Sequence, residues 1–409
     1  MENKVLKIAL IGLGQRGNGL LTNLLCLEEV EVAYICDLFP ERIEKIKARI
    51  AEANKPAPVG FANYEDVIAA KPDAILVATS WSNHVKTALA AMSAGIPVAI
   101  EVGGTHDIED CWKLVDCYEK TKTPFMFLEN CCYNRDEILA TSLVRNGKFG
   151  EVVHCYGEYC HDLREEIAGG IDTHHYRLEE YKHHNCDNYP THELGPIAKL
   201  LNINRGNRFV RLVSMSSKAR GMNVYIDKTE KYANRLGGTH FDQGDVTTTM
   251  IQCENGETIL LKLDTTLPHL YSRGLRIEGT LGCYDQNAQH VNIDGTINDE
   301  EFLQDGKFFQ NQKEYSEYLS DDWRNITKEQ MEAGHGGMDY VMLKHYFHCI
   351  RDHLEMPIDV YDAVSWMVVT ALSAESIAKG SIPVEFPDFT RGKWKTRQPV
   401  DVIDLPKIS

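Results

Sequence analysis

Short apolar runs alternate with amphipathic segments over the first third of the chain. The apolar runs are Val5 to Ile11, Glu31 to Cys36, Ala74 to Ala78, Val98 to Val102 and Phe125 to Leu128. Between them, segments such as Asn83 to Ala94 and Asp107 to Glu119 have the apolar periodicity of helices. Fully apolar strands that alternate with helices are typical of a parallel sheet covered on both faces. The pattern therefore predicts a doubly wound α/β domain over residues 1–130.

The pattern changes at about residue 150, where longer strands with alternating polarity begin. These strands are Val152 to Cys160, Phe209 to Ser216, Thr247 to Ile251, Thr258 to Leu263 and Leu275 to Glu278. Alternation of this kind favours a mostly antiparallel sheet with one open face. We therefore expect an α+β domain over residues 131–409, and a homodimer or homotetramer that covers the open face.

The last third of the chain adds a polar segment and two helices. Residues 286–335 are rich in Asp, Gln and Asn, so we expect an excursion or lid with little core. Helical periodicity returns over Gly336 to His353 and Asp359 to Ala378. We expect the C-terminal helix and tail to pack back on the first domain.

Composition and charge narrow the choice of partners. Lys and Arg number 43 against 60 Asp and Glu, a net charge of −17 that repels nucleic acid and anionic membranes. No apolar stretch is long enough to span a membrane. The 12 cysteines are scattered without a Cys-x-x-Cys motif, and the first strand begins at Val5, which leaves no room for an export signal. We expect a cytoplasmic protein with reduced thiols.

A glycine-rich loop follows the first strand directly. Its sequence is Gly12-Leu13-Gly14-Gln15-Arg16-Gly17, the pattern with which a Rossmann domain turns tightly and brings its backbone to a pyrophosphate. Asp37 ends the second strand about 20 residues after the last glycine, where a carboxylate binds a ribose 2′-hydroxyl. Because an acid repels a 2′-phosphate, the cofactor expected is NAD rather than NADP.

Polar residues also follow the next three strands, at the edge where open α/β sheets bind ligands. They are Trp81-Ser82-Asn83-His84, Glu101-Val102-Gly103-Gly104 and Asn130. The alternative for the first group is purely structural, with Ser82 or Asn83 capping a helix and Trp81 packing.

These residues together resemble the Gfo/Idh/MocA oxidoreductase superfamily, over nearly the whole chain. Most members have Glu-Lys-Pro where this sequence has Glu101-Val102-Gly103, and Asp where it has Asn188. At both of these positions the sequence instead resembles a narrower branch of the superfamily. That branch comprises the NAD-dependent glycoside hydrolases, whose known activity is α-N-acetylgalactosaminidase. Shared features of that branch are Glu-Val, Trp-x-x-His, Tyr-x-Thr-His before Gly195-Pro196, Gly336-Gly337-Met338-Asp339, and the tail Phe386 to Trp394.

The resemblance implies a set of site residues. Beside the fingerprint glycines Gly12, Gly14 and Gly17, it implies that NAD contacts Gln15, Arg16, Asp37, Trp81, Asn83, His84, Glu101, Val102 and Asn130. It implies that the sugar contacts Tyr159, Arg177, Tyr189, Thr191, His192 and Tyr271. The implied reaction oxidises sugar C3, removes the C2 proton, expels the C1 substituent, adds water and reduces C3 again.

This reaction needs groups that move protons. Tyr189 and His192 are three residues apart at a predicted helix start, which places them on one face. We assign His192 to the C3 hydroxyl and Tyr189 to C2 or its enolate, although the reverse order is equally compatible with the sequence. The alternative is a half-buried structural pair.

Metal binding is a minor alternative. Adjacent histidines such as His174-His175 and His183-His184 point in different directions, so they do not make a zinc site alone. A metal held by Asp187 and His192 remains open, and we predict no metal in the main interpretation.

Two other functions are compatible with this fold. One is an NAD-dependent sugar or inositol dehydrogenase, which would carry the lysine that is missing after Glu101. The other is a regulator that binds dinucleotide without turnover, which would not need both Tyr189 and His192.

Overall fold

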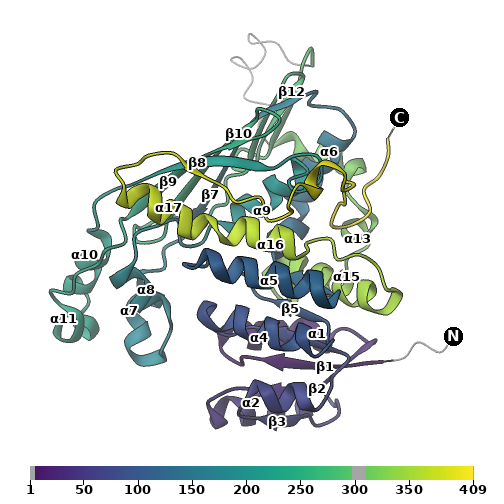
Figure 1. Ribbon diagram of the computed structural model, residues 1–409, viewed down its shortest axis with the longest axis vertical. Helices are drawn as coiled ribbons and strands as arrows, with labels where there is room; N and C mark the ends of the chain where they lie inside the picture. The colour runs from purple at the N-terminus through teal and green to yellow at the C-terminus, as the bar shows by residue number, and fades with distance from the viewer. Residues whose placement is uncertain (1–4, 297–309, 409) are drawn as a thin grey trace. The chain divides into compact units, whose positions relative to one another are not determined.

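A computed structural model describes residues 5–296 and 310–408 (Figure 1). The chain divides into two units. The first comprises Met1–Arg135, Ser320–Val364 and Asp401–Asp404. The second comprises Asp136–Leu319, Ser365–Val400 and Leu405–Ser409.

The first unit contains a six-stranded parallel sheet in the order β3-β2-β1-β4-β5-β6. Its strands are β1 (Leu6–Ile11), β2 (Val30–Cys36), β3 (Val59–Phe61), β4 (Ala74–Val77), β5 (Val98–Ile100) and β6 (Phe125–Phe127). The predicted doubly wound domain is confirmed. The sequence pattern missed β3, because three residues, one of them a glycine, give no readable periodicity.

Helices connect these strands, as crossovers between parallel strands require. They are α1 (Gln15–Leu25), α2 (Pro40–Glu52), α3 (Tyr64–Ala69), α4 (Trp81–Ser93) and α5 (Ile108–Thr121), followed by the 3₁₀ turn η1 (Asn130–Tyr133). The strand order reverses direction between β1 and β4. In open α/β sheets the crevice at this reversal binds the ligand.

The first unit also contains later helices. They are α13 (Asp321–Arg324), α14 (Lys328–Glu332), the turn η3 (His335–Gly337), α15 (Met338–Asp352) and α16 (Val360–Met367), of which α16 extends into the second unit. Helix α15 packs on α1 and η1. Trp323 is buried, and its indole N–H donates to the Tyr133 carbonyl at 2.9 Å. Part of the predicted polar excursion is therefore packed into the core, so the expectation that residues 286–335 have little core is wrong for this part. Residues 297–309 of the excursion lie outside the described chain.

The second unit contains an eight-stranded sheet in the order β13-β12-β11-β7-β10-β9-β8-β14. Its strands are β7 (Val152–Cys160), β8 (Phe209–Ser216), β9 (Val246–Cys253), β10 (Thr258–Asp264), β11 (Arg276–Gly279), β12 (Gly282–Asp285), β13 (His290–Ile293) and β14 (Val384–Glu385). Only the β7–β10 pair is parallel among the described pairs of this sheet. This confirms the predicted α+β class.

Helices pack on one face of this sheet. The unit contains α6 (Arg135–Arg145), α7 (Arg164–Thr173), α8 (Arg177–His183), α9 (Thr191–Leu200), α10 (Gly221–Lys228), α11 (Glu230–Leu236), η2 (Asn311–Tyr318), α17 (Val369–Ala378) and η4 (Lys393–Lys395). Helix α9 lies so close to β7 that a Cβ on Gly157 would be 2.8 Å from that of Glu193. Met215 and Met250 are exposed on β8 and β9. Across residues 5–296 and 310–408, the helices are all too short or too polar to cross a membrane.

Candidate active site

The glycine loop between β1 and α1 has the conformation that dinucleotide binding requires. Gly12 has φ of +89°, and a Cβ there would lie 2.5 Å from the Ala78 carbonyl oxygen. A Cβ on Gly17 would lie 1.9 Å from the Gly12 oxygen, so helix and strand approach here without side chains. A Cβ on Gly14 would make only an ordinary van der Waals contact, 3.8 Å from Arg42 Nη1. The loop and the start of α1 therefore fit a pyrophosphate.

Asp37 is fixed beside this loop at the end of β2. Its Oδ2 accepts from the Leu13 amide at 2.7 Å and its Oδ1 from the Phe39 amide at 2.9 Å. Arg42 approaches the same carboxylate at 3.6 Å. The acid is thus held at the position from which it can accept from a ribose hydroxyl.

The start of α4 shows the packing that the structural interpretation of Trp81 to His84 predicts, but Ser80, rather than Ser82 or Asn83, is the N-cap residue. Trp81 packs against Gly103, where a Cβ would lie 2.2 Å from the indole. The Asn83 amide donates to the Ser80 hydroxyl at 2.9 Å. Burial lowers the pKa of His84 to about 4, so the neutral ring donates through Nε2 to the Thr79 carbonyl at 3.0 Å. Packing is therefore present, and contact of these residues with NAD remains a prediction.

Arg16 brings several of the predicted cofactor residues together. Its Nε donates to Glu101 at 2.8 Å, and its two terminal nitrogens donate to Asp339 at 2.7 and 2.8 Å. The Asn130 amide donates to the same Asp339 carboxylate at 2.7 Å. Burial alone would raise the pKa of Asp339, but the charge of Arg16 and the hydrogen bonds hold it well below the usual value.

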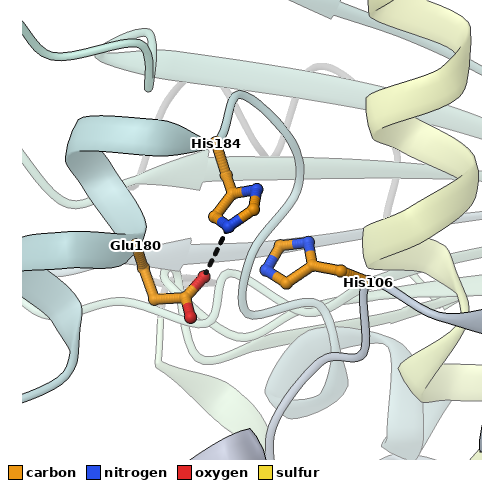
Figure 2. A group of neighbouring side chains, drawn as sticks. All are labelled: His106, Glu180 and His184. Carbon is orange, nitrogen blue, oxygen red and sulfur yellow. Dashed lines mark ion pairs between the residues drawn. The ribbon is translucent and has the colours of Figure 1, made fainter.

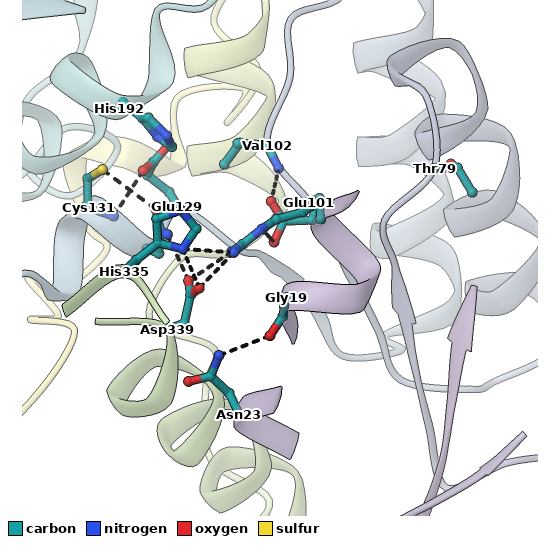
Figure 3. Close-up of polar contacts among 12 residues, drawn as sticks. Gly19, Asn23, Thr79, Glu101, Val102, Glu129, Cys131, His192, His335 and Asp339 are labelled. Carbon is teal, nitrogen blue, oxygen red and sulfur yellow. Dashed lines mark hydrogen bonds and ion pairs between the residues drawn. The ribbon is translucent and has the colours of Figure 1, made fainter. Parts of the chain in front are cut away.

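Asp339 also holds His335, a contact that sequence reasoning missed. His335 Nδ1 lies 2.7 Å from Asp339 Oδ2 and 3.2 Å from an Arg16 nitrogen (Figure 3). Since the arginine has no acceptor, the shorter contact identifies Nδ1–H as a donor to the carboxylate. This leaves Nε2 available on a side chain that is 54% exposed. The spacing of His335 and Asp339, four residues apart before a helical pattern, is the signal that could have identified the pair.

The second unit brings the predicted sugar residues into one aromatic cluster. The Tyr189 hydroxyl lies 3.5 Å from His192 Nε2, and the Tyr159 ring lies 4.8 Å from the Tyr189 ring. The Arg177 guanidinium stands over the Tyr189 ring at 4.8 Å. Tyr271 reaches the Tyr159 ring at 6.2 Å between centroids. Residues from β7, α8, the start of α9 and the loop after β10 thus converge, and their contact with a sugar stays a prediction.

Two further residues belong to this cluster by contact. His161 Nδ1 lies 3.4 Å from the Tyr159 hydroxyl, and burial lowers the His161 pKa. Glu166 forms an ion pair with Arg177 at 2.9 Å. Burial also raises the pKa of Tyr159, which keeps its phenol protonated. Sequence reasoning missed His161 although it follows Tyr159 at the strand end, two residues away on the same face.

The alternative metal positions are not supported by the side-chain contacts. Asp187 is fully buried and its Oδ2 accepts from Thr249 at 3.1 Å, while its amide donates to Ser373 at 2.8 Å. Within the described chain, no group of potential ligands at metal-binding distance contains both Asp187 and His192. His184 instead pairs with Glu180 at 3.7 Å (Figure 2). Its neighbour His183 pairs with a different carboxylate, that of Glu179, at 3.2 Å.

Comparison with known proteins identifies both parts of the chain. Residues 6–128 match the oxidoreductase family with an NAD-binding Rossmann fold, and residues 133–396 match the glycosyl hydrolase 109 C-terminal domain. An alpha-N-acetylgalactosaminidase of Tannerella forsythia is 38% identical over 97% of this chain and 88% of its own length. A glycosyl hydrolase family 109 protein of Stenotrophomonas maltophilia (strain K279a) is 37% identical over 98% of this chain and 93% of its own.

Solved structures show the same fold at low identity. A levoglucosan dehydrogenase in complex with NADH and L-sorbose has a TM-score of 0.70 at 17% identity and covers 94% of this chain and 100% of its own. The scyllo-inositol dehydrogenase of Lactobacillus casei with NAD(H) and scyllo-inositol has a TM-score of 0.63 at 14% identity, covering 93% and 99%. Given the matched domains and the long alignments with its relatives, this chain belongs to the glycosyl hydrolase 109 family and carries that family's C-terminal domain behind an NAD-binding Rossmann domain.

Proposed function

We propose that this protein cleaves an N-acetyl-α-galactosaminide and that bound NAD acts in the reaction without net consumption. The observation that carries the proposal is the cluster of Tyr159, Tyr189 and His192 in a glycosyl hydrolase 109 domain. Ordinary glycosidases place two carboxylates across the glycosidic bond. Here the residues at hydrogen-bonding distance are a phenol and an imidazole, which suit proton transfer next to a carbonyl better than oxocarbenium chemistry.

The residues of the first unit fit NAD. The backbone around Gly14 would hold the pyrophosphate, and Asp37 would hold the adenosine ribose. The Arg16 main chain at the start of α1 would contribute an amide, since its side chain is bound to Asp339 and Glu101. Bound NAD supplies reversible oxidation at sugar C3, which makes the C2 hydrogen acidic and allows the C1 substituent to leave by elimination.

His192 and Tyr189 would move the protons at the sugar. An imidazole takes and returns a proton near neutral pH, which suits His192 to the C3 hydroxyl. Tyr189 would act at C2 or at the enolate oxygen. The Arg177 charge over its ring favours a negative oxygen at that point of the reaction. Their mutual distance of 3.5 Å allows a proton to pass between them with little rearrangement.

The remaining residues of the cluster would position the sugar. Arg177 is buried and paired with Glu166, which fixes its direction and leaves it suited to a carbonyl of the N-acetyl group. Thr191 and Tyr271 would contact the ring, and Tyr271 is 48% exposed, as expected for a residue at the entrance of a site.

The proposal is tested with p-nitrophenyl glycosides, including the N-acetyl-α-galactosaminide, with and without added NAD. We expect release of p-nitrophenol that depends on NAD, with no net change in absorbance at 340 nm. A sugar dehydrogenase is the alternative activity, because solved dehydrogenases have the same fold. Accumulation of NADH without cleavage would favour a sugar dehydrogenase and overturn the proposal.

We also propose a homodimer or homotetramer in the cytoplasm. Exposed Met215 and Met250 on the sheet of the second unit support a contact between copies. None of the twelve cysteines, all of which lie in the described part of the chain, forms a disulfide, which supports a reducing compartment. Light scattering of the purified protein distinguishes a monomer from these assemblies.

A further inference from the structure

Three side chains of the types that bind zinc meet in the second unit, at the ends of two neighbouring strands. Cys160 is the last residue of β7, and Asp264 is the last residue of β10 and its partner in the parallel register. His269 lies in the loop that follows. One ligand atom from each residue can be chosen so that all three lie within 4.8 Å of one another. No residue that we assign to NAD or to the sugar is among the three.

The backbone holds these residues in place. The His161 amide donates to the Asp264 carbonyl at 2.9 Å, so the loop begins beside the end of β7. Cys160 and Ser272 exchange amide hydrogen bonds of 3.0 and 2.9 Å, so the loop also ends there. Both ends of the segment that carries His269 are therefore fixed next to Cys160. A ligand that binds to such a fixed segment costs less conformational entropy than a ligand that must first order a flexible loop.

His269 presents a free nitrogen. Its Nδ1 lies 2.6 Å from the Leu270 carbonyl oxygen. Because a carbonyl only accepts, Nδ1 carries the hydrogen and Nε2 keeps its lone pair. A histidine that donates one ring N–H to a carbonyl while the other nitrogen binds metal is the usual arrangement in metal sites.

Asp264 supplies an independent observation. The residue is only 3% exposed, and its Oδ1 has no hydrogen-bond partner among the described residues. Buried carboxylate oxygens normally have a partner, because an unsatisfied one loses its hydration without compensation. A cation would supply the missing partner of this buried oxygen.

We propose that Cys160, Asp264 and His269 bind a zinc ion, with water as the fourth ligand. Sulfur, nitrogen and carboxylate oxygen are the donors of tetrahedral zinc sites, and three protein ligands leave one position open. Binding releases the thiol proton to solvent, so the thiolate and the carboxylate balance the charge of Zn²⁺. The metal would fix the loop that carries Tyr271.

Lys262 sets the affinity of this site. Its ammonium lies 3.8 Å from Asp264 Oδ2 and its side chain is 28% exposed, so it can turn to solvent when a metal binds. Lys262 and Zn²⁺ therefore compete for the same carboxylate. Removing the lysine charge should strengthen zinc binding, whereas a purely structural cluster would show no such response.

The test uses Co²⁺ as a spectroscopic probe on the full chain after treatment with a chelator. We expect one equivalent to give the near-ultraviolet band of thiolate-bound cobalt, and zinc to displace it. Cys160→Ser should abolish the band, and His269→Gln should weaken binding by more than about tenfold. Lys262→Gln should tighten zinc binding, measured by competition with a chromophoric chelator.

Matched controls come from the same unit. Cys283→Ser changes another cysteine of this sheet, and His240→Gln changes an exposed histidine that pairs with Asp242. Both should leave the cobalt spectrum unchanged. If Cys160→Ser fails to fold by circular dichroism, His269→Gln, in a surface loop, still decides the matter. Absence of the thiolate band in folded protein, or unchanged affinity in His269→Gln, would overturn the proposal, whatever the glycosidase assay shows.

Discussion

Arg16 and Asp339 are 323 residues apart in the chain, yet two nitrogens of the guanidinium bond both oxygens of the carboxylate. This paired geometry is the strongest that an arginine and a carboxylate make. It links the start of α1, beside the glycine loop, to the start of α15. The contact therefore holds the later helix of the first unit to the part of the Rossmann sheet that is expected to bind NAD.

Asp339→Asn should destabilise the first unit by about 2 kcal/mol at pH 7, because it removes one of the two carboxylates that pair with Arg16 and leaves only Glu101. The folded pKa of Asp339 lies below the value near 3.9 of an unfolded chain, so its contribution is present above that pH and is lost as the pH falls below it. Urea unfolding at pH 7 and pH 3 measures both effects. Equal free energies of unfolding of the variant and the parent protein at pH 7 would show that this ion pair does not stabilise the first unit.

Asp37→Ser should shift the cofactor preference towards NADP. The substitution removes the charge that repels a 2′-phosphate, and Arg42 already stands 3.6 Å from the Asp37 carboxylate, where it could bind that phosphate. Calorimetric titration with NAD and NADP gives the ratio of affinities. Arg42→Ala in the Asp37→Ser background is the matched control, since it should cancel the gain for NADP while changing NAD binding little.

The sequence predicted the elements with strong periodicity and the residues with a spacing signature. The bounds of β7 and β8 agree with prediction. Tyr189 and His192 also meet, although Tyr189 lies before the first residue of α9 and the two do not share a helix face. Contacts between distant segments could not be predicted in the same way. The bonds of Asp339 to Arg16 and Asn130 depend on how α15 packs, which no local pattern encodes.

The wrong expectation also has a physical cause. The polar composition of residues 286–335 predicts a segment with little core, yet one tryptophan, Trp323, anchors part of it by burial and a hydrogen bond. The meeting of Cys160 with His269 depends on a return of the loop after β10 to β7, and this pairing of Cys160 with Ser272 has no signature in the sequence.

His192→Ala and Tyr189→Phe should each lower turnover by about 10² to 10⁴-fold, the range for general acid and base groups. Affinity for NAD should stay nearly unchanged, because neither residue belongs to the unit that contains the glycine loop. Steady-state kinetics with calorimetry separates the two effects. Turnover close to that of the parent in both variants would mean that the pair is structural.

Hydrolysis in D₂O tests the central claim most directly. In the redox route the C2 hydrogen leaves the sugar and is replaced from solvent, whereas oxocarbenium hydrolysis never breaks that bond. NMR or mass spectrometry of the released sugar should therefore find deuterium at C2 and protium at C3. Cleavage of the glycoside with protium fully retained at C2 would contradict the account.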